Sequence, residues 1–180
     1  AAVWVAGKPR KPLGAAAGVS LWSVAMAHFA LQFGRTEPNK IYRERPSVYG
    51  VCLGPDEKIA VARIGLKAPY EYDLPGGGVE QGESEADALM REFQEETGLT
   101  VWPARAIGRA GQFWIDRGAH RNSLGQFFEV ELSADDDKPT EADHHLVWMA
   151  PYEAAMAMRH DSHAWAIMLW DRQRRQSGKF

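Results

Sequence analysis

The clearest pattern of apolar positions in this chain lies between Ser84 and Thr97, a segment without proline or glycine. Its apolar residues recur at helical spacing: Ala86, Leu89, Met90, Phe93 and Thr97. Positions i, i+3, i+4 and i+7 share one face of a helix, so the spacing predicts a helix over residues 84–97 that buries this face. Gly98 follows directly and is expected near the C-terminal cap.

Shorter stretches on both sides of this helix have the composition of strands and are bounded by turn residues. Strands are predicted over residues 47–53, 58–64, 70–74, 99–102, 106–110, 112–116, 126–132 and 146–149. The turn residues Gly54-Pro55-Asp56-Glu57 predict that the first two strands form a hairpin. Helices are predicted over residues 151–158 and from Ser162 to about Arg174. This order of elements indicates an α/β fold in which helices cover both faces of a mixed sheet.

The beginning of the chain shows no clear period. Residues 1–40 are expected to form an N-terminal extension, and residues 41–180 the folded domain. A basic run from Lys8 to Lys11, an apolar run over residues 13–27 and small residues around Met26 superficially match a secretory signal. Glycines interrupt the apolar run, which is too short for a membrane span. The preferred interpretation places the natural start at Met26, with an export signal as the alternative.

Composition narrows the functional classes. A chain of 180 residues that is 45% hydrophobic and 25% charged has the composition of one globular domain with a sizeable core. The formal net charge of −3 gives no general attraction to nucleic acid, so a polymer held in a broad basic groove is disfavoured. The single Cys52 excludes an internal disulfide, and its apolar neighbours predict a buried, inert thiol. A reducing, cytoplasmic location fits these features.

The predicted helix over residues 84–97 carries a cluster of carboxylates beside its apolar face. Glu92, Glu95 and Glu96 are three and four residues apart, which makes them neighbours on the helix surface. The alternative is a solvated acidic face, but such faces usually contain Lys at i+4. Mg²⁺ would relieve the repulsion, since it prefers oxygen ligands and is typically shared between carboxylates and substrate phosphates. The cluster therefore predicts a Mg²⁺ site, with Mn²⁺ as an alternative, and phosphoryl chemistry.

Of two features beside the cluster, the first supports this prediction and the second is neutral. Gly76, Gly77 and Gly78 precede the helix and allow the backbone to approach a metal or a phosphate closely. Arg91 lies four residues from both Asp87 and Glu95, a spacing that also fits an ordinary surface ion pair.

The 23 residues from Gly77 to Leu99 contain every fixed position of the Nudix signature: Gly77, Glu83, Arg91, Glu92, Phe93, Glu95, Glu96, Gly98 and Leu99. From about residue 45 to residue 170 the chain resembles a Nudix hydrolase. The resemblance implies an α/β/α sandwich and Mg²⁺-dependent hydrolysis of a nucleoside diphosphate linked to another moiety. It also implies metal ligands from Glu92, Glu95, Glu96 and the Gly76 carbonyl, with Arg91 orienting the glutamates.

Further candidates lie outside this signature. The family usually takes one more acid from elsewhere, and Glu141 and Asp143 are the candidates here, with a solvated acidic loop as the alternative. His144 and His145 are not expected to form a metal pair, because neighbours in an extended segment point to opposite faces. No third ligand for such a pair lies nearby in the sequence.

Substrate contacts are expected from the glycine loop and from residues after the helix. A loop bordering the pocket is predicted at Arg117, Arg121 and Asn122. These residues either make charge-assisted hydrogen bonds to phosphate or are simply solvated. Four aromatic residues are candidates to stack on a base, although aromatics in strands usually belong to a core: Tyr72, Trp114, Phe127 and Phe128. Of all these residues, Gly77, Gly78, Arg117 and Trp114 are the preferred substrate contacts.

The substrate prediction rests on elimination within the family. The proline expected in ADP-ribose hydrolases is absent from Gln112–Ile115, and the tyrosine of dinucleoside polyphosphate hydrolases and the motifs for NADH and coenzyme A are absent too. Residues 74–78 also differ from the Pro-Gln-Gly-Gly loop of RNA 5′-pyrophosphohydrolases. A (d)NTP or related small nucleotide remains. The alternatives are ADP-ribose, a nucleotide sugar, a dinucleoside polyphosphate or a non-catalytic nucleotide-binding domain. The chain is expected to act as a monomer or homodimer away from membranes.

Overall fold

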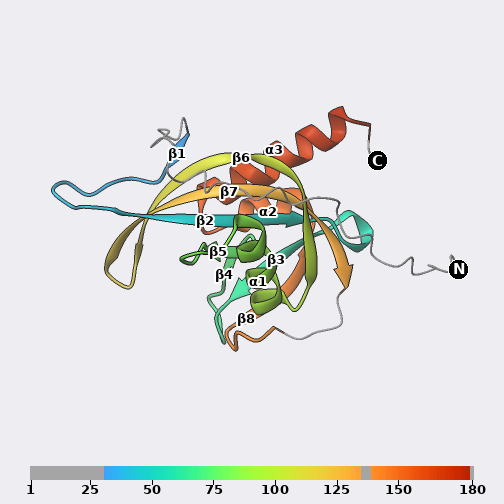
Figure 1. Cartoon of the computed structure of the whole chain (residues 1–180), viewed down its shortest axis with the longest axis horizontal. Helices are drawn as coiled ribbons and strands as arrows, with labels where there is room; N and C mark the ends of the chain where they lie inside the picture. Colours follow the sequence, from blue (N-terminus) through green and yellow to red (C-terminus); the bar gives the residue numbers. More distant parts are fainter. Residues whose placement is uncertain (1–30, 135–138, 179–180) are drawn as a thin grey trace, which may run out of the picture.

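The computed structural model describes residues 31–134 and 139–178 (Figure 1). Met26 and the basic run around residue 10 lie outside these residues. The elements in chain order are β1 (Gln32–Phe33), β2 (Arg43–Cys52), the 3₁₀ turn η2 (Pro55–Glu57), β3 (Ile59–Ile64), β4 (Glu71–Asp73), β5 (Gly76–Gly78), α1 (Glu85–Thr97), β6 (Thr100–Asp116), β7 (Ala119–Ala134), β8 (His144–Met149), α2 (Pro151–Ala157) and α3 (Asp161–Gln176).

The strands form two sheets. A mixed five-stranded sheet has the order β1-β6-β7-β2-β5, and an antiparallel three-stranded sheet has the order β4-β3-β8. The predicted hairpin of residues 47–53 with residues 58–64 is therefore wrong, because β2 and β3 belong to different sheets and share only the bridge between Leu53 and Ile59. Asp56 and Glu57, both at positive φ, turn the chain away from β2, and β3 pairs with β4 and β8 instead.

β6 and β7 make the longest hairpin. The three strands predicted between residues 99 and 116 are a single strand, β6, interrupted only by register shifts. Arg117 and Gly118, both at positive φ, close the turn to β7. The prediction of a loop at Arg121 and Asn122 is wrong. A two-residue turn already reverses the chain, so both residues pair within β7, opposite Trp114 and Phe113 respectively.

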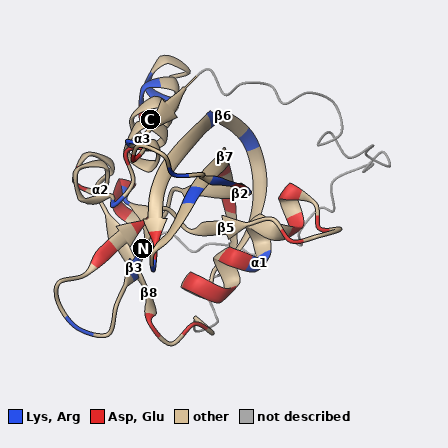
Figure 2. Ribbon diagram, turned by 90° about the vertical axis from the view of Figure 1, so that its left-hand side faces the viewer, with Lys and Arg blue, Asp and Glu red and all other residues tan. Residues whose placement is uncertain are grey.

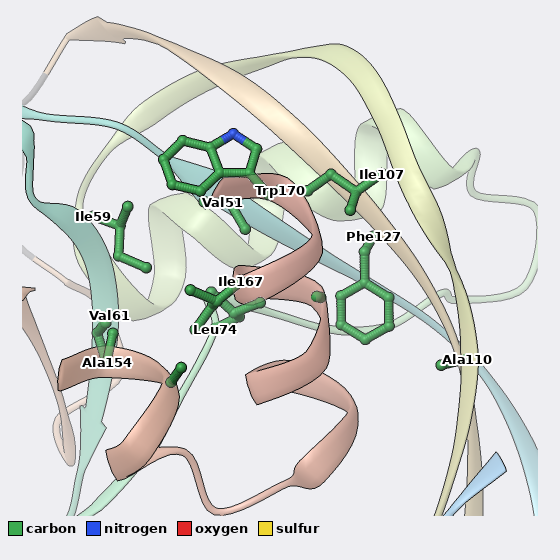
Figure 3. Packing of buried hydrophobic residues seen from close by; sticks show 12 residues of the cluster. Val51, Ile59, Val61, Leu74, Ile107, Ala110, Phe127, Ala154, Ile167 and Trp170 are labelled. Atoms are coloured by element: carbon green, nitrogen blue, oxygen red, sulfur yellow. The ribbon is translucent and has the colours of Figure 1, made fainter. Parts of the chain in front are cut away.

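Helices cover the sheets from both sides, with α1 on one side and α2 and α3 on the other (Figure 1). Adjacent strand residues point to opposite layers: Val51 packs under α2 and α3, whereas Cys52 packs under α1. Figure 3 shows the larger cluster, which includes Trp170 and Ile167 of α3 and Phe127 of β7. The predicted α/β/α sandwich with a mixed sheet is thus confirmed.

The described part of the predicted N-terminal extension touches the domain. β1 pairs in parallel with β6, through Gln32 opposite Gly111, and Phe33 packs against the core beneath α3. No helix in the described ranges is both long and apolar enough to cross a membrane. Cys52 is fully buried, as predicted, and burial raises the pKa of its thiol to about 12.

Candidate active site

The carboxylate helix α1 is held by caps and by one apolar face. At its start the Ser84 side chain accepts a hydrogen bond from the Asp87 backbone N–H, and at its end Gly98 adopts the left-handed conformation. Leu89 and Phe93 are fully buried against the sheet. With this face fixed, Glu92 is only 9% exposed and faces the glycine strand β5.

The backbone of β5 lies directly against two carboxylates of α1. The Gly76 N–H donates a 3.0 Å hydrogen bond to Glu96 Oε2. A Cβ at position 77 would lie 2.6 Å from Glu92 Oε1, so only glycine leaves room for that carboxylate. A Cβ at Gly76, where φ is +142°, would lie 2.1 Å from the Val48 carbonyl oxygen. The glycine run thus permits close packing between β5, β2 and two glutamates.

Arg91 contacts residues of the signature both before α1 and on α1 itself. Its Nε lies 2.9 Å from Glu83 Oε1, and its Nη1 lies 3.0 Å from Glu92 Oε1 and 2.9 Å from Glu95 Oε2. Its Nη2 also donates to the Gly78 carbonyl oxygen at 3.2 Å. The hydrogen bond from Arg91 holds the pKa of Glu83 below its usual range. Arg91 is therefore the centre of a network rather than a member of one surface pair.

The two innermost carboxylates lack full compensation. Burial raises the pKa of Glu92, and the Arg91 guanidinium offsets this only in part. Burial raises the pKa of Glu96 well above its usual value, although the bond from Gly76 opposes the shift. The ionised forms of such groups need a nearby positive charge. A set of clustered oxygen donors with this need fits a divalent cation.

The segment before β8 completes the cluster. Its backbone is fixed to α1, because the N–H groups of Thr140 and Glu141 both donate to the Glu95 carbonyl oxygen, at 2.9 and 3.0 Å. Oxygens of Glu96 and Glu141 and a nitrogen of His144 lie within 4.8 Å of one another. Asp143 is exposed and contacts the His144 ring. Figure 2 shows acidic residues gathered on α1 and on the segment leading into β8.

The cluster opens into a cavity of about 360 Å³, which adjoins a second cavity of about 610 Å³. Five residues line both: Ile64, Trp114, His144, Arg159 and His160. Of the predicted substrate contacts, Gly77 lines the smaller cavity, Arg117 the larger and Trp114 both, whereas Gly78 is held by Arg91 and lines neither. Tyr72, Phe127 and Phe128 pack in the two cores.

One wall of the cavity carries charges that the sequence did not reveal. Arg159 pairs with Asp73 and Glu71, and its guanidinium carbon lies 5.5 Å from the Trp114 ring centroid. Burial alone would raise the pKa of Asp73, but the neighbouring side chains of His163, His160 and Arg159 together hold it below its usual range. Burial also lowers the pKa of His160 to about 4. The base-stacking candidate Trp114 is thus flanked by a fixed cation.

Comparison with known proteins agrees with this geometry. A family model described as NUDIX domain matches residues 43–170. This range is well over half of the chain, and the chain therefore belongs to the Nudix family, as the signature predicted.

Individual relatives are more distant. The chain is 33% identical over 110 residues to an 8-oxo-(d)GTP phosphatase of Mycolicibacterium smegmatis, covering 61% of this chain and 33% of that protein. It is 41% identical over 74 residues to an RNA pyrophosphohydrolase of Caulobacter vibrioides, covering 41% of each. Both alignments thus span well under half of the relative's own length. A NUDIX hydrolase from Nitrosomonas europaea has the same fold, with a TM-score of 0.61, 20% identity and coverage of 73% of this chain and 90% of that one.

Proposed function

We propose that the chain hydrolyses a phosphoanhydride bond in a nucleoside diphosphate linked to another moiety. The observation that carries the proposal is the packing of Glu92 and Glu96 against glycine backbone at the inner end of an open cavity. A structural or interaction domain would gain nothing from burying two carboxylates with incomplete compensation. A binding module without catalysis would not need the complete signature.

The metal in this proposal is Mg²⁺, with Mn²⁺ as an alternative. Glu92, Glu95, Glu96 and the backbone carbonyl of Gly76 would hold it. When bound, Mg²⁺ polarises phosphoryl oxygens and lowers the pKa of bound water. The chemistry of the donor set fits such a hard cation, since all four groups offer oxygen.

The remaining steps belong to the side chains. Arg91 holds the carboxylates of Glu92 and Glu95 in place through short ion pairs. Glu141, at the mouth of the cluster, is the preferred group to take the proton from the attacking water. Trp114 lines both cavities and would stack on a base, and Arg117 lines the larger cavity and would neutralise phosphate charge. Arg159, beside Trp114, adds a second positive charge to the same wall.

The preferred substrate is a (d)NTP or related small nucleotide. The similarity to a protein named 8-oxo-(d)GTP phosphatase supports this choice over ADP-ribose, a nucleotide sugar or a dinucleoside polyphosphate. Because another relative is named RNA pyrophosphohydrolase, the 5′ end of RNA is a further candidate substrate, although the net charge of −3 disfavours a long polymer. We further propose that the protein acts in the cytoplasm as a monomer or homodimer.

The test is a phosphate- and pyrophosphate-release screen of purified protein with Mg²⁺ or Mn²⁺. The panel contains dNTPs, NTPs, ADP-ribose, nucleotide sugars, dinucleoside polyphosphates and a short 5′-triphosphate RNA. We expect turnover of at least one dNTP or NTP, and its loss in Glu92→Gln. Absence of turnover on every compound would refute the proposal, and binding without turnover would identify a non-catalytic domain.

A further inference from the structure

The imidazole of His144, the first residue of β8, lies between three carboxylates. Its Nδ1 lies 2.8 Å from Glu141 Oε2 and 3.0 Å from Asp143 Oδ1, and its Nε2 lies 3.5 Å from Glu96 Oε1. The ring is only 13% exposed and lines the cavity beside the carboxylate cluster. The neighbouring His145 is exposed and does not line either cavity.

The two ring nitrogens have different surroundings. Nδ1 is within hydrogen-bonding distance of two carboxylates, which can only accept, so Nδ1 carries a proton. Nε2 is then the ring nitrogen that remains for a cation. It lies 3.5 Å from Glu96 Oε1, which is longer than an ordinary N–H···O hydrogen bond. Two donor atoms bound to one cation at about 2.0–2.2 Å lie roughly 3 to 3.5 Å apart, and the observed spacing falls in that range.

The backbone around His144 is fixed in this position. The His144 N–H donates to the Glu141 carbonyl oxygen at 3.2 Å, and the Gly65 N–H donates to the Asp143 carbonyl oxygen at 2.9 Å. β8 pairs with β3 through His144 opposite Ile64. A histidine whose distal N–H is held by a carboxylate while the other nitrogen faces a cation site is the usual arrangement of a metal ligand.

We propose that His144 Nε2 is a metal ligand next to Glu96, and that this nitrogen makes one cation position selective for Mn²⁺ or Co²⁺ over Mg²⁺. Mg²⁺ takes oxygen ligands almost exclusively, whereas an imidazole strengthens the binding of first-row transition metals. The proposal deepens the proposed function, since it concerns the same carboxylate cluster. It requires only metal binding, however, so it can be tested without turnover.

The first experiment measures metal affinity by calorimetry, with MgCl₂, MnCl₂ and CoCl₂ as separate titrants, for wild type, His144→Gln and the control His145→Gln. The substitution His144→Gln puts an amide oxygen in place of the imidazole nitrogen. We expect a loss of about 10- to 100-fold in Co²⁺ and Mn²⁺ affinity and a change of less than about threefold for Mg²⁺. His145→Gln should match wild type with all three metals.

A second measurement keeps the proposal testable if His144→Gln fails to fold. In wild-type protein labelled with ¹⁵N-histidine, Zn²⁺ serves as a diamagnetic probe of the nitrogens. The proposal expects the Nε2 resonance of His144 to shift on metal addition while Nδ1 keeps its proton. Unchanged Nε2 on saturation with Zn²⁺, or equal Co²⁺ affinity in wild type and a folded His144→Gln, would show that His144 is only an ion-pair partner. Either result would leave hydrolysis of nucleotides with Mg²⁺ untouched.

Discussion

Glu96→Gln separates the structural and the metal-binding consequences of one carboxylate. The variant keeps the size of the side chain, and its amide oxygen can still accept the hydrogen bond from the Gly76 N–H. Burial raises the pKa of Glu96, so the ionised form opposes folding at neutral pH when no metal is present. Removing this charge should stabilise the metal-free protein by on the order of 1 kcal/mol or more.

The effect of metal has the opposite sign. At a Mg²⁺ concentration ten times the dissociation constant, binding stabilises the wild type by about 1.4 kcal/mol. For a chain of 180 residues this corresponds to an increase in melting temperature of roughly 3–6 °C. Glu96→Gln should lose most of this increase and at least about a hundredfold in turnover, because a preorganised charge at the reacting group is lost.

The assay compares melting temperatures with and without Mg²⁺, together with turnover on the best substrate. Glu85→Gln is the matched control, since Glu85 lies in the first turn of the same helix and its closest cation, on Arg109, is 3.9 Å away. That variant should behave like wild type. If Glu96→Gln kept near-normal turnover and the same Mg²⁺-induced increase, the metal would have to bind elsewhere and the assignment of this helix would be wrong.

Three further predictions concern the surroundings of the cluster. Gly77→Ala should push the Glu92 carboxylate aside and lower turnover strongly. The free energy of unfolding should stay within about 1 kcal/mol of wild type, because the displaced group is the end of a flexible side chain. Urea unfolding and turnover assays measure the two effects. Trp114→Ala should raise KM by about 5- to 150-fold at nearly constant kcat, since stacking on a base contributes about 1–3 kcal/mol, and Trp114→Phe should retain most of the affinity. The imidazole of His160 has a pKa of about 4 in the folded chain and about 6.5 in the unfolded chain. As the pH falls through this range, only the unfolded chain gains the proton, so the free energy of unfolding should fall by up to roughly 3 kcal/mol. His160→Gln should lack this component in urea unfolding at pH 7.5 and pH 5, and an identical pH dependence in both proteins would contradict the buried, neutral imidazole.

Local patterns predicted the elements that carry the carboxylates. The apolar period of residues 84–97 and the following Gly98 predicted α1 within one residue of its observed bounds. The family resemblance and the α/β/α layers were predicted as well, because both follow from short-range features: a contiguous signature and the order of helices and strands. Turn chemistry was less informative, since Gly54-Pro55-Asp56-Glu57 marks a change of direction without specifying whether the next strand joins the same sheet.

Long-range packing decided what the sequence could not show. Sequence spacing disfavours a metal pair at His144 and His145, because neighbours in a strand point apart and no third ligand lies nearby. In the fold, however, β8 brings His144 to Glu96, 48 positions earlier. Likewise, nothing local links Asp73 to Arg159, which the return of the chain through α2 places together. An imidazole next to Glu141 and Asp143 was the available signal, because a metal-bound histidine commonly has a carboxylate partner.

The position of Cys52 makes it a native reporter for motion of the layer that carries the carboxylates. Its thiol is fully buried beneath Leu89 and Phe93 of α1, and it is the only cysteine in the sequence. A thiol reagent can reach it only when α1 lifts from the sheet or the whole domain unfolds, so the modification rate in native buffer measures the free energy of that opening. A slower rate in the presence of Mg²⁺ would mean that a cation held between α1 and β5 also restrains the helix against its own core.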